Sequence, residues 1–263
     1  MKSILVPALL ASALVSLTPV TYAQESTLAY NVGVVSDYRY RGLSQSRLDP
    51  ALQGGVDYAN KSGFYVGAWA STIKWIADNS YNSGVKTGTD ITGNVELDIY
   101  GGYKFDLAKD VAMDVGFLRY QYVGNNLEMT RGTARSVYSD ANTNEVYAAI
   151  TMGPVTAKYS YSLGDLFGYI DSRGSGYFDL SANFEVLPSW TVTPHFGRQN
   201  VTAAVYNASY NDMSLTVTKD LGKGLSASLG YFGTSAEIGN YSSPYDNKFL
   251  GERGAVLGVK YTF

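Results

Sequence analysis

Apolar and polar residues alternate over short stretches of the chain from about residue 27 to the C-terminus. Near the end, apolar or aromatic side chains stand at Ala255, Leu257, Val259, Tyr261 and Phe263, with Gly, Lys and Thr between the last four. A period of two is that of a β-strand, whose side chains point alternately to its two faces. An edge strand with such an apolar face would aggregate in water, whereas in a bilayer the same face is favourable.

The alternation predicts roughly twelve strands, joined by alternately short and long connections. They are expected near residues 27–38, 50–59, 63–75, 92–105, 110–122, 144–152, 154–163, 176–187, 189–199, 208–219, 224–235 and 254–263. The short connections are residues 60–63, 106–110, 153–154, 187–189 and 220–224. An even number of strands with short turns at one end and long loops at the other predicts an all-β, antiparallel transmembrane barrel. Both termini would then lie on the periplasmic side.

A soluble β-sandwich also alternates, with its apolar face turned inward, so the faces alone do not decide between the two folds. Val95, Leu97 and Ile99, for example, alternate with Glu96 and Asp98. The regular order of short and long connections favours the barrel. Tyrosines are numerous near the strand ends, as expected for the aromatic girdles of a membrane barrel.

Residues 1–23 combine an early lysine, an apolar run and a small-residue finish, which predicts a secretory signal peptide cleaved after Ala23. The alternative is a membrane-anchoring helix. Pro7, Ser12 and Ser16 interrupt the run, and no basic flank follows it. Residues 24–263 contain no further apolar stretch of about 18 residues, so we expect the mature chain to cross a membrane only as strands. No linker divides it, and we expect one barrel domain over residues 24–263.

Composition agrees with an exported β protein. The chain has 28 glycines, 23 tyrosines and 16% charged residues, a mixture that suits pleated strands and tight turns. It has no cysteine, which excludes disulfides and thiolate metal sites and leaves the hydrogen-bonded ladder as the source of stability. The formal charge of −3 is too small to suggest a nucleic-acid partner. We expect no metal and no cofactor.

The stretch at residues 36–71, SDYRYRGLSQSRLDPALQGGVDYANKSGFYVGAWAS, resembles the opening of the TorF family of proteobacterial porins. The matching positions are Ser36, Asp37, Tyr38, Arg41, Gly42, Ser44, Gln45, Pro50, Gln53 and Gly54. Residues 96–105, 177–199 and 217–234 are also similar to that family, whereas the loops at 76–91 and 124–143 are not. The resemblance implies an outer-membrane barrel with a pore, and it supplies neither a substrate nor a binding site.

The arginines of YRYRG form the chief candidate site. Asp37, Arg39 and Arg41 share one phase of the expected first strand, while Tyr38 and Tyr40 share the other with Val34. A basic side chain facing lipid near the midplane costs about 2–4 kcal/mol, so the charged set is expected to face the lumen. There it could bind an anion or line a constriction. Alternatively, the arginines pair with carboxylates to brace the wall, or sit at the loop rim without a ligand.

Other strands place charged residues in the inward phase. The complete set of lumen or constriction candidates is Asp37, Arg39, Arg41, Asp57, Glu96, Asp98, Lys158, Asp179 and His195. Both signs are mixed, so no ion selectivity is predicted.

Catalysis is not expected. His195 is the only histidine, no GxSxG-like segment accompanies it, and it lacks companion ligands for zinc. Glu96 and Asp98 are spaced as glycosidase acids could be, but simple alternation produces that pairing freely.

The sequence therefore predicts a narrow outer-membrane channel for passive diffusion of small hydrophilic solutes. Alternatives are a closed structural or adhesive barrel and, less favoured, an outer-membrane hydrolase. Expected partners are the solutes, outer-membrane lipid and the barrel insertion machinery. That machinery would read the C-terminal signal formed by Leu257, Val259, Tyr261 and Phe263.

Overall fold

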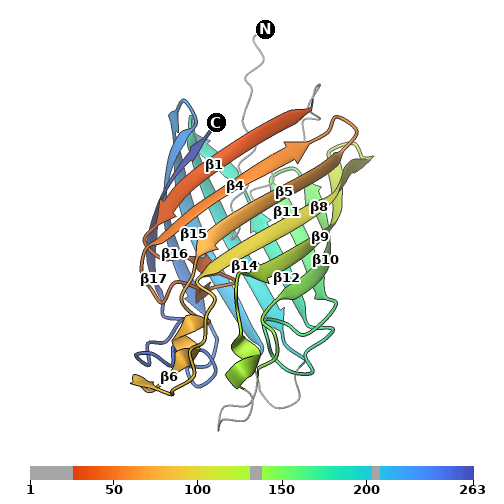
Figure 1. The fold of residues 1–263 in the computed structure, drawn as a ribbon. Coiled ribbons are helices and arrows are strands. Elements are labelled where there is room, and N and C mark those ends of the chain that lie inside the picture. Colours follow the sequence, from red (N-terminus) through yellow and green to blue (C-terminus); the bar gives the residue numbers. More distant parts are fainter. Residues whose placement is uncertain (1–25, 131–137, 203–207) are drawn as a thin grey trace.

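A computed structural model describes residues 26–130, 138–202 and 208–263 (Figure 1). The wall strands are β1 (Thr27–Val35), β4 (Ala51–Ala59), β5 (Phe64–Thr72), β8 (Val95–Ala108), β9 (Val111–Tyr122), β10 (Thr143–Met152), β11 (Val155–Ser162), β12 (Gly176–Ala182), β13 (Phe184–Leu187), β14 (Trp190–Asn200), β15 (Tyr210–Gly222), β16 (Leu225–Thr234) and β17 (Gly254–Thr262). The connections hold β2 (Arg39–Tyr40), β3 (Leu43–Ser44), β6 (Tyr81–Asn82), β7 (Val85–Lys86) and the 3-10 helices η1 (Ala77–Ser80) and η2 (Leu127–Thr130). The expected signal peptide lies outside the described residues.

The wall strands form one closed antiparallel sheet. Each pairs with its neighbour along the chain, and β1 pairs with β17, where Val34 faces Val259. Both β12 and β13 pair with β14, so they are two halves of one strand interrupted at Asn183. The barrel therefore has twelve wall strands, and the predicted fold class is confirmed. Closure leaves no strand edge exposed, as a bilayer requires.

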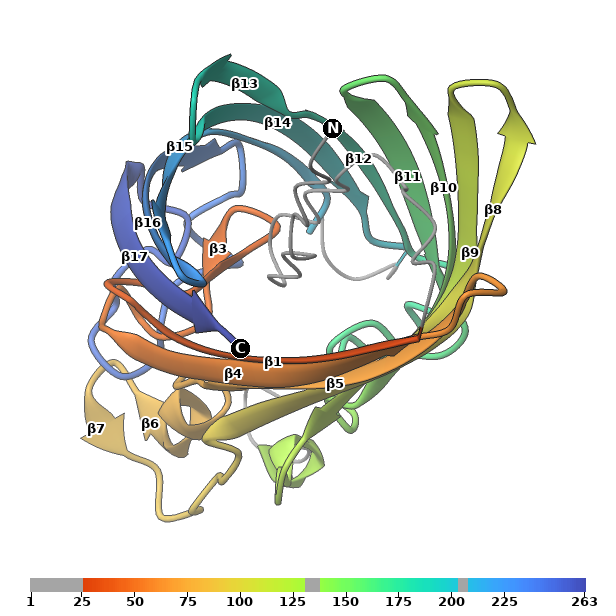
Figure 2. The ribbon, with the colours of Figure 1, turned by 90° about the horizontal axis from the view of Figure 1, so that it is seen from above.

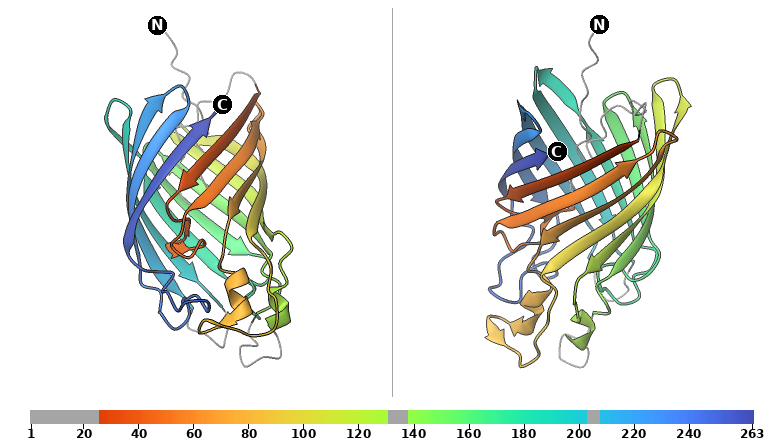
Figure 3. Two further views of the ribbon diagram at one scale, coloured as in Figure 1. Left: turned by 60° about the vertical axis from the view of Figure 1, so that its left-hand side comes forward. Right: turned by 45° about the horizontal axis from the view of Figure 1, so that its top comes forward.

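Short turns and long connections lie at opposite ends of the barrel (Figures 1 and 3). We name them the turn end and the loop end. The C-terminus and the start of β1 lie at the turn end (Figure 1). Within the described ranges, no helix is long and apolar enough to cross a membrane.

The outward face of the wall is apolar. On β17, Leu257 is 62% exposed, and Val259 and Tyr261 are also exposed on the same face. Phe263 follows the strand and exchanges two backbone hydrogen bonds with Tyr30 of β1, each 2.9 Å long. The rings of Tyr30 and Phe263 also stack, with centroids 5.7 Å apart. The last residue thus belongs to the seam that closes the barrel.

Inside the wall, tyrosine rings lie against glycines of the neighbouring strand. Tyr65 of β5 faces Gly102 of β8, and Gly67 faces Tyr100. A Cβ atom at Gly67 would lie 2.6 Å from the Tyr100 ring, and one at Gly102 would lie 2.5 Å from the Tyr65 hydroxyl. Glycine is therefore required for these rings to lie along the wall, an arrangement that also covers the bare backbone.

The first connection departs from the predicted pattern. The sequence predicts a first strand that runs to residue 38, with Tyr38 on the face opposite to the charged residues; β1 instead ends at Val35. Beyond it the chain enters the barrel, where β2 and β3 form a small hairpin inside the ring of strands (Figure 2). Tyr38 is only 1% exposed, like its charged neighbours. The extrapolation of strand phase fails because the strand ends and the chain bends at residues 36 and 37, before Tyr38.

Candidate functional site

Residues 36–50 connect β1 to β4 and fold into the lumen, and we name this segment the inner loop. Backbone hydrogen bonds fix it to two other long connections. The Ser44 amide donates to the Leu250 carbonyl at 2.8 Å, and the Lys74 amide donates to the Gln45 carbonyl at 2.8 Å. The inner loop is thus held on more than one side at the loop end of the barrel.

Asp37 and Arg39 form an ion pair within the inner loop. The Nε of Arg39 donates to one carboxylate oxygen of Asp37, and the other oxygen accepts hydrogen bonds from the Ser44 and Ser46 hydroxyls. Arg39 also donates from Nη1 to the Leu250 carbonyl at 3.2 Å. Both charges are buried and compensated, so this pair maintains the shape of the hairpin.

Arg41 joins the tip of the inner loop to two separated wall strands. Its Nη2 donates to both carboxylate oxygens of Glu145 on β10, at 2.7 and 3.0 Å. Its Nη1 donates to the Gln199 side chain on β14 at 2.8 Å, and its Cζ lies 4.4 Å from the centroid of the Tyr177 ring. The sequence left three roles open for the arginines: anion binding or constriction, pairing with a carboxylate, and a place at the loop rim. Arg41 is paired with a carboxylate. A buried pair of this kind fixes position more than it adds stability.

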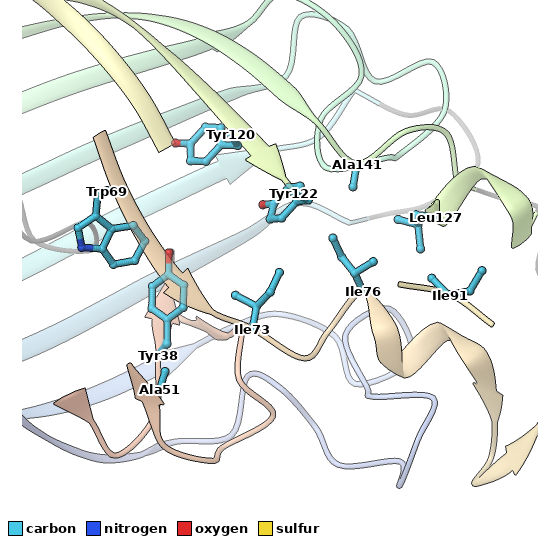
Figure 4. Packing of buried hydrophobic residues seen from close by; sticks show 10 residues of the cluster. All are labelled: Tyr38, Ala51, Trp69, Ile73, Ile76, Ile91, Tyr120, Tyr122, Leu127 and Ala141. Atoms are coloured by element: carbon cyan, nitrogen blue, oxygen red, sulfur yellow. The ribbon is translucent and has the colours of Figure 1, made fainter. Parts of the chain in front are cut away.

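Glu96 and Asp98 lie on β8 beside the inner loop and are almost fully buried. The Tyr38 hydroxyl donates to Glu96 at 2.7 Å. The Oδ1 of Asp98 is buried without a hydrogen-bond partner among the described residues. Tyr38 also packs edge-on against Trp69, with ring centroids 5.4 Å apart, in the aromatic cluster that continues through Tyr120 and Tyr122 to the loop end (Figure 4).

Three further candidates lie on the wall towards the turn end. Asp57 accepts a hydrogen bond from the Tyr100 hydroxyl. Lys158 faces Asp179 across the β11–β12 pair, and its Nζ lies 4.0 Å from the centroid of the Tyr147 ring. Asp179 also lies 2.9 Å from His195, and His195 lies 3.6 Å from Asp212. Asp212 in turn lies against Gly42 of the inner loop, so this part of the wall is connected to the inner loop through side chains.

His195 lies between two carboxylates. Its Nε2 is 2.9 Å from Asp179, and its Nδ1 is 3.6 Å from Asp212. The Tyr177 hydroxyl lies 3.3 Å from Nε2 and donates to Asp212 at 3.0 Å. Both ring nitrogens are thus directed at carboxylates. A histidine that acts as the general base of a hydrolase would instead have one ring nitrogen directed at the hydroxyl or thiol of a nucleophile. Among the described residues, no group of three His, Cys, Asp or Glu side chains could hold a metal ion.

Ion pairs also connect the loops above the barrel. Arg47 of the inner loop contacts Asp78 at 2.8 Å and Asp246 at 3.8 Å. Lys74 pairs with Asp49 at 2.6 Å, and this hydrogen bond lowers the pKa of the Asp49 carboxyl. Burial raises the pKa of Asp78, partly offset by its hydrogen bond from Ser243 and by Arg47. These contacts join three connections into one assembly.

A pocket opens at the loop end between the inner loop and the other long connections. Its volume is about 110 Å³. The lining combines aromatic rings with amides and one charged side chain; its aromatic members are Tyr40, Trp75, Tyr122, Tyr138, Phe167, Tyr169, Tyr210 and Tyr241. Arg41 and Gln199 also line it. The pocket therefore adjoins the groups that hold the tip of the inner loop.

Sequence reasoning missed several of these residues. Gln199 and Asp212 contact Arg41 and His195, respectively, and both lie in the inward phase of strands that were predicted correctly. Inspection of every inward position, including neutral ones, would have found them. Tyr38 and Tyr40 were assigned to the opposite face, and no strand-based signal places them in the lumen.

A closed antiparallel barrel with an exposed apolar face, a polar interior and long loops at one end defines an outer-membrane barrel. We therefore assign the protein to the outer membrane of a Gram-negative bacterium. The chain belongs to a family described as bacterial protein of unknown function (Gcw_chp), whose model matches residues 21–263.

Solved porin structures share the fold. The KdgM porin has a TM-score of 0.52 and 9% identity, over 90% of this chain and 99% of that chain. The NanC porin has a TM-score of 0.52 and 10% sequence identity, and the match covers 89% of this chain and 99% of that chain. A structure described as KdgM porin in complex with disordered oligogalacturonate has a TM-score of 0.51 and 10% sequence identity. The match covers 90% of this chain and 99% of that chain. At sequence identities this low, the similarity shows a shared fold alone. No curated protein sequence matches the chain.

Proposed function

We propose that the protein is a narrow porin of the TorF type, through which small hydrophilic solutes diffuse passively across the outer membrane. The observation that carries the proposal is the polar inward face of the wall, which continues past the inner loop towards the turn end. Buried serines and threonines line it there, including Thr151, Thr156, Ser181, Thr193, Thr216 and Ser226. A polar interior of this kind is typical of outer-membrane barrels, whereas the core of a soluble β protein is apolar.

The two ion pairs of the inner loop bear on the selectivity of the channel. Arg39 is compensated by Asp37 and Arg41 by Glu145, so neither arginine supplies a free positive charge. We infer weak ion selectivity, with the inner loop acting as the constriction. The KdgM structures support a role in solute passage by fold alone, and the bound oligogalacturonate is a property of that protein.

A closed structural barrel is the second candidate, because the inner loop occupies the lumen at the loop end. Conductance in a planar bilayer distinguishes the two. A diffusion channel gives discrete steps with the wild-type chain, and larger steps when residues 38–45 are replaced by a short Gly-Ser linker. A barrel closed by the inner loop conducts only after that replacement. Silence of both folded proteins would reject a channel altogether.

We also propose the roles that the sequence predicts for the two ends of the chain. Residues 1–23 act as a cleaved export signal, and residues 24–263 form one barrel domain without enzymatic activity. The aromatic end of β17, with Phe263, is recognised by the insertion machinery before the β1–β17 seam closes.

A further inference from the structure

We propose that the pocket at the loop end binds an uncharged polyhydroxylated ring, such as one unit of a neutral saccharide, before the solute passes the inner loop. The inference rests on the proposed channel function and names the solute class that such a channel admits. The pocket volume of about 110 Å³ is well above the roughly 10–15 Å³ that a single water molecule needs, so the pocket admits a solute larger than water.

The charge of the lining excludes ionic ligands. Arg41 is the only charged residue among those that line the pocket, all of which lie in the described part of the chain. Its guanidinium is already paired with Glu145 at 2.7 Å. A solute carboxylate would meet no free counter-charge, and a solute ammonium would meet a guanidinium and no lining carboxylate. Either ion would lose its hydration without compensation.

The aromatic rings offer rigid apolar surfaces. Trp75 and Tyr122 pack edge-on with centroids 5.3 Å apart, and Tyr210 and Tyr241 do so at 5.2 Å. Both pairs line the pocket, although they come from different parts of the wall and loops. Aromatic rings provide a large contact area at a small cost in conformational entropy. The C–H faces of a sugar ring are an apolar surface that matches them.

Polar side chains share the lining with the rings. The amide side chains of Gln45, Asn79 and Gln199 line the pocket, together with the tyrosines. Amides and phenolic hydroxyls exchange hydrogen bonds with the hydroxyl groups of a sugar. A purely apolar solute would cover these polar groups without offering them a partner.

The test uses three trisaccharides of similar size and different charge: maltotriose, trigalacturonate and triglucosamine. Each is added to the loop side of the full-length mature protein in a planar bilayer, and the interruption of ionic current is measured. Maltotriose should block about tenfold more strongly than either charged trimer. Equal or stronger block by a charged trimer, or block by none in a conducting channel, would overturn the inference and leave the channel function intact.

Variants locate the site. Trp75→Ala should weaken the maltotriose block about tenfold, which corresponds to one lost aromatic contact. Trp75→Phe should weaken it less, because a smaller aromatic ring remains. Tyr81→Ala is the control, since Tyr81 packs on Tyr245 at the loop end but does not line the pocket. If Tyr81→Ala weakened the maltotriose block as much as Trp75→Ala does, the saccharide would not bind in the pocket.

A direct binding measurement separates the two proposals. Trp75 is one of three tryptophans, so maltotriose should change the fluorescence of the detergent-purified protein and not that of Trp75→Phe. If the protein fails to conduct but this fluorescence change persists, the channel function fails and the saccharide site stands. If it conducts but the wild type shows no change with maltotriose, the saccharide site is wrong.

Discussion

Gly67 and Tyr100 show how a single side chain sets the shape of the lumen wall. Because a Cβ atom at Gly67 would lie 2.6 Å from the Tyr100 ring, Gly67→Ala forces the ring away from the wall. We expect a loss of about 1–3 kcal/mol in the free energy of unfolding. Adding Tyr100→Ala should recover part of that loss in a double-mutant cycle measured by denaturation in micelles. Strictly additive losses would contradict the ring-over-glycine packing.

Arg41 and Glu145 form the most buried charged contact of the inner loop. Arg41→Gln leaves the Glu145 carboxylate, which is 1% exposed, without its counter-ion. We expect this variant to lose about 3–5 kcal/mol of stability. The Arg41→Gln/Glu145→Gln double variant should lose less than the single variant, because no uncompensated charge remains. Denaturant midpoints in micelles measure both, and a larger loss in the double variant would contradict a coupled pair.

At the scale of elements, β17 presents its two faces to different solvents. Leu257 is exposed on the outer face, so Leu257→Arg should cost about 2–4 kcal/mol if it lies near the bilayer midplane. Lys260→Gln, on the inner face of the same strand, should fold normally. Assembly into the outer membrane is measured for both, and equal tolerance would show that the faces have been assigned wrongly.

The end of β17 also carries a kinetic prediction. Phe263 contributes two backbone hydrogen bonds and one ring contact to the seam, a modest share of the closed sheet. Its deletion should therefore reduce assembly in cells more than it lowers the stability of barrels refolded in detergent. A Phe263→Tyr variant, which keeps the aromatic ring, is the matched control. An equal effect of the deletion in both assays would indicate a structural role only.

The wall strands form a closed ring of hydrogen-bonded pairs. Every wall strand has two neighbours, so no strand can leave the sheet without breaking both of its pairings. We expect the mature protein to keep compact electrophoretic mobility in detergent until it is heated, and then to migrate as an unfolded chain. Mobility independent of heating would contradict a closed barrel. Recovery of the protein from the soluble periplasmic fraction would contradict its membrane location.

The sequence alone determined the wall. The alternation of apolar and polar residues predicted twelve strands, the short turns between them and the outward row of β17, because strand period and lipid burial are properties of neighbouring residues along the chain. Even the split of residues 176–187 into β12 and β13 left the predicted strand in place.

The interior was decided by the tertiary structure. Arg41 and Glu145 are 104 residues apart in the chain, and only closure of the barrel brings β10 and β14 within reach of one guanidinium. The inner loop leaves the strand pattern at residue 36 because its polar side chains find partners inside the lumen, and no local periodicity records those partners. The pocket follows from the same cause, since its rings and amides come from connections whose meeting depends on the closed sheet.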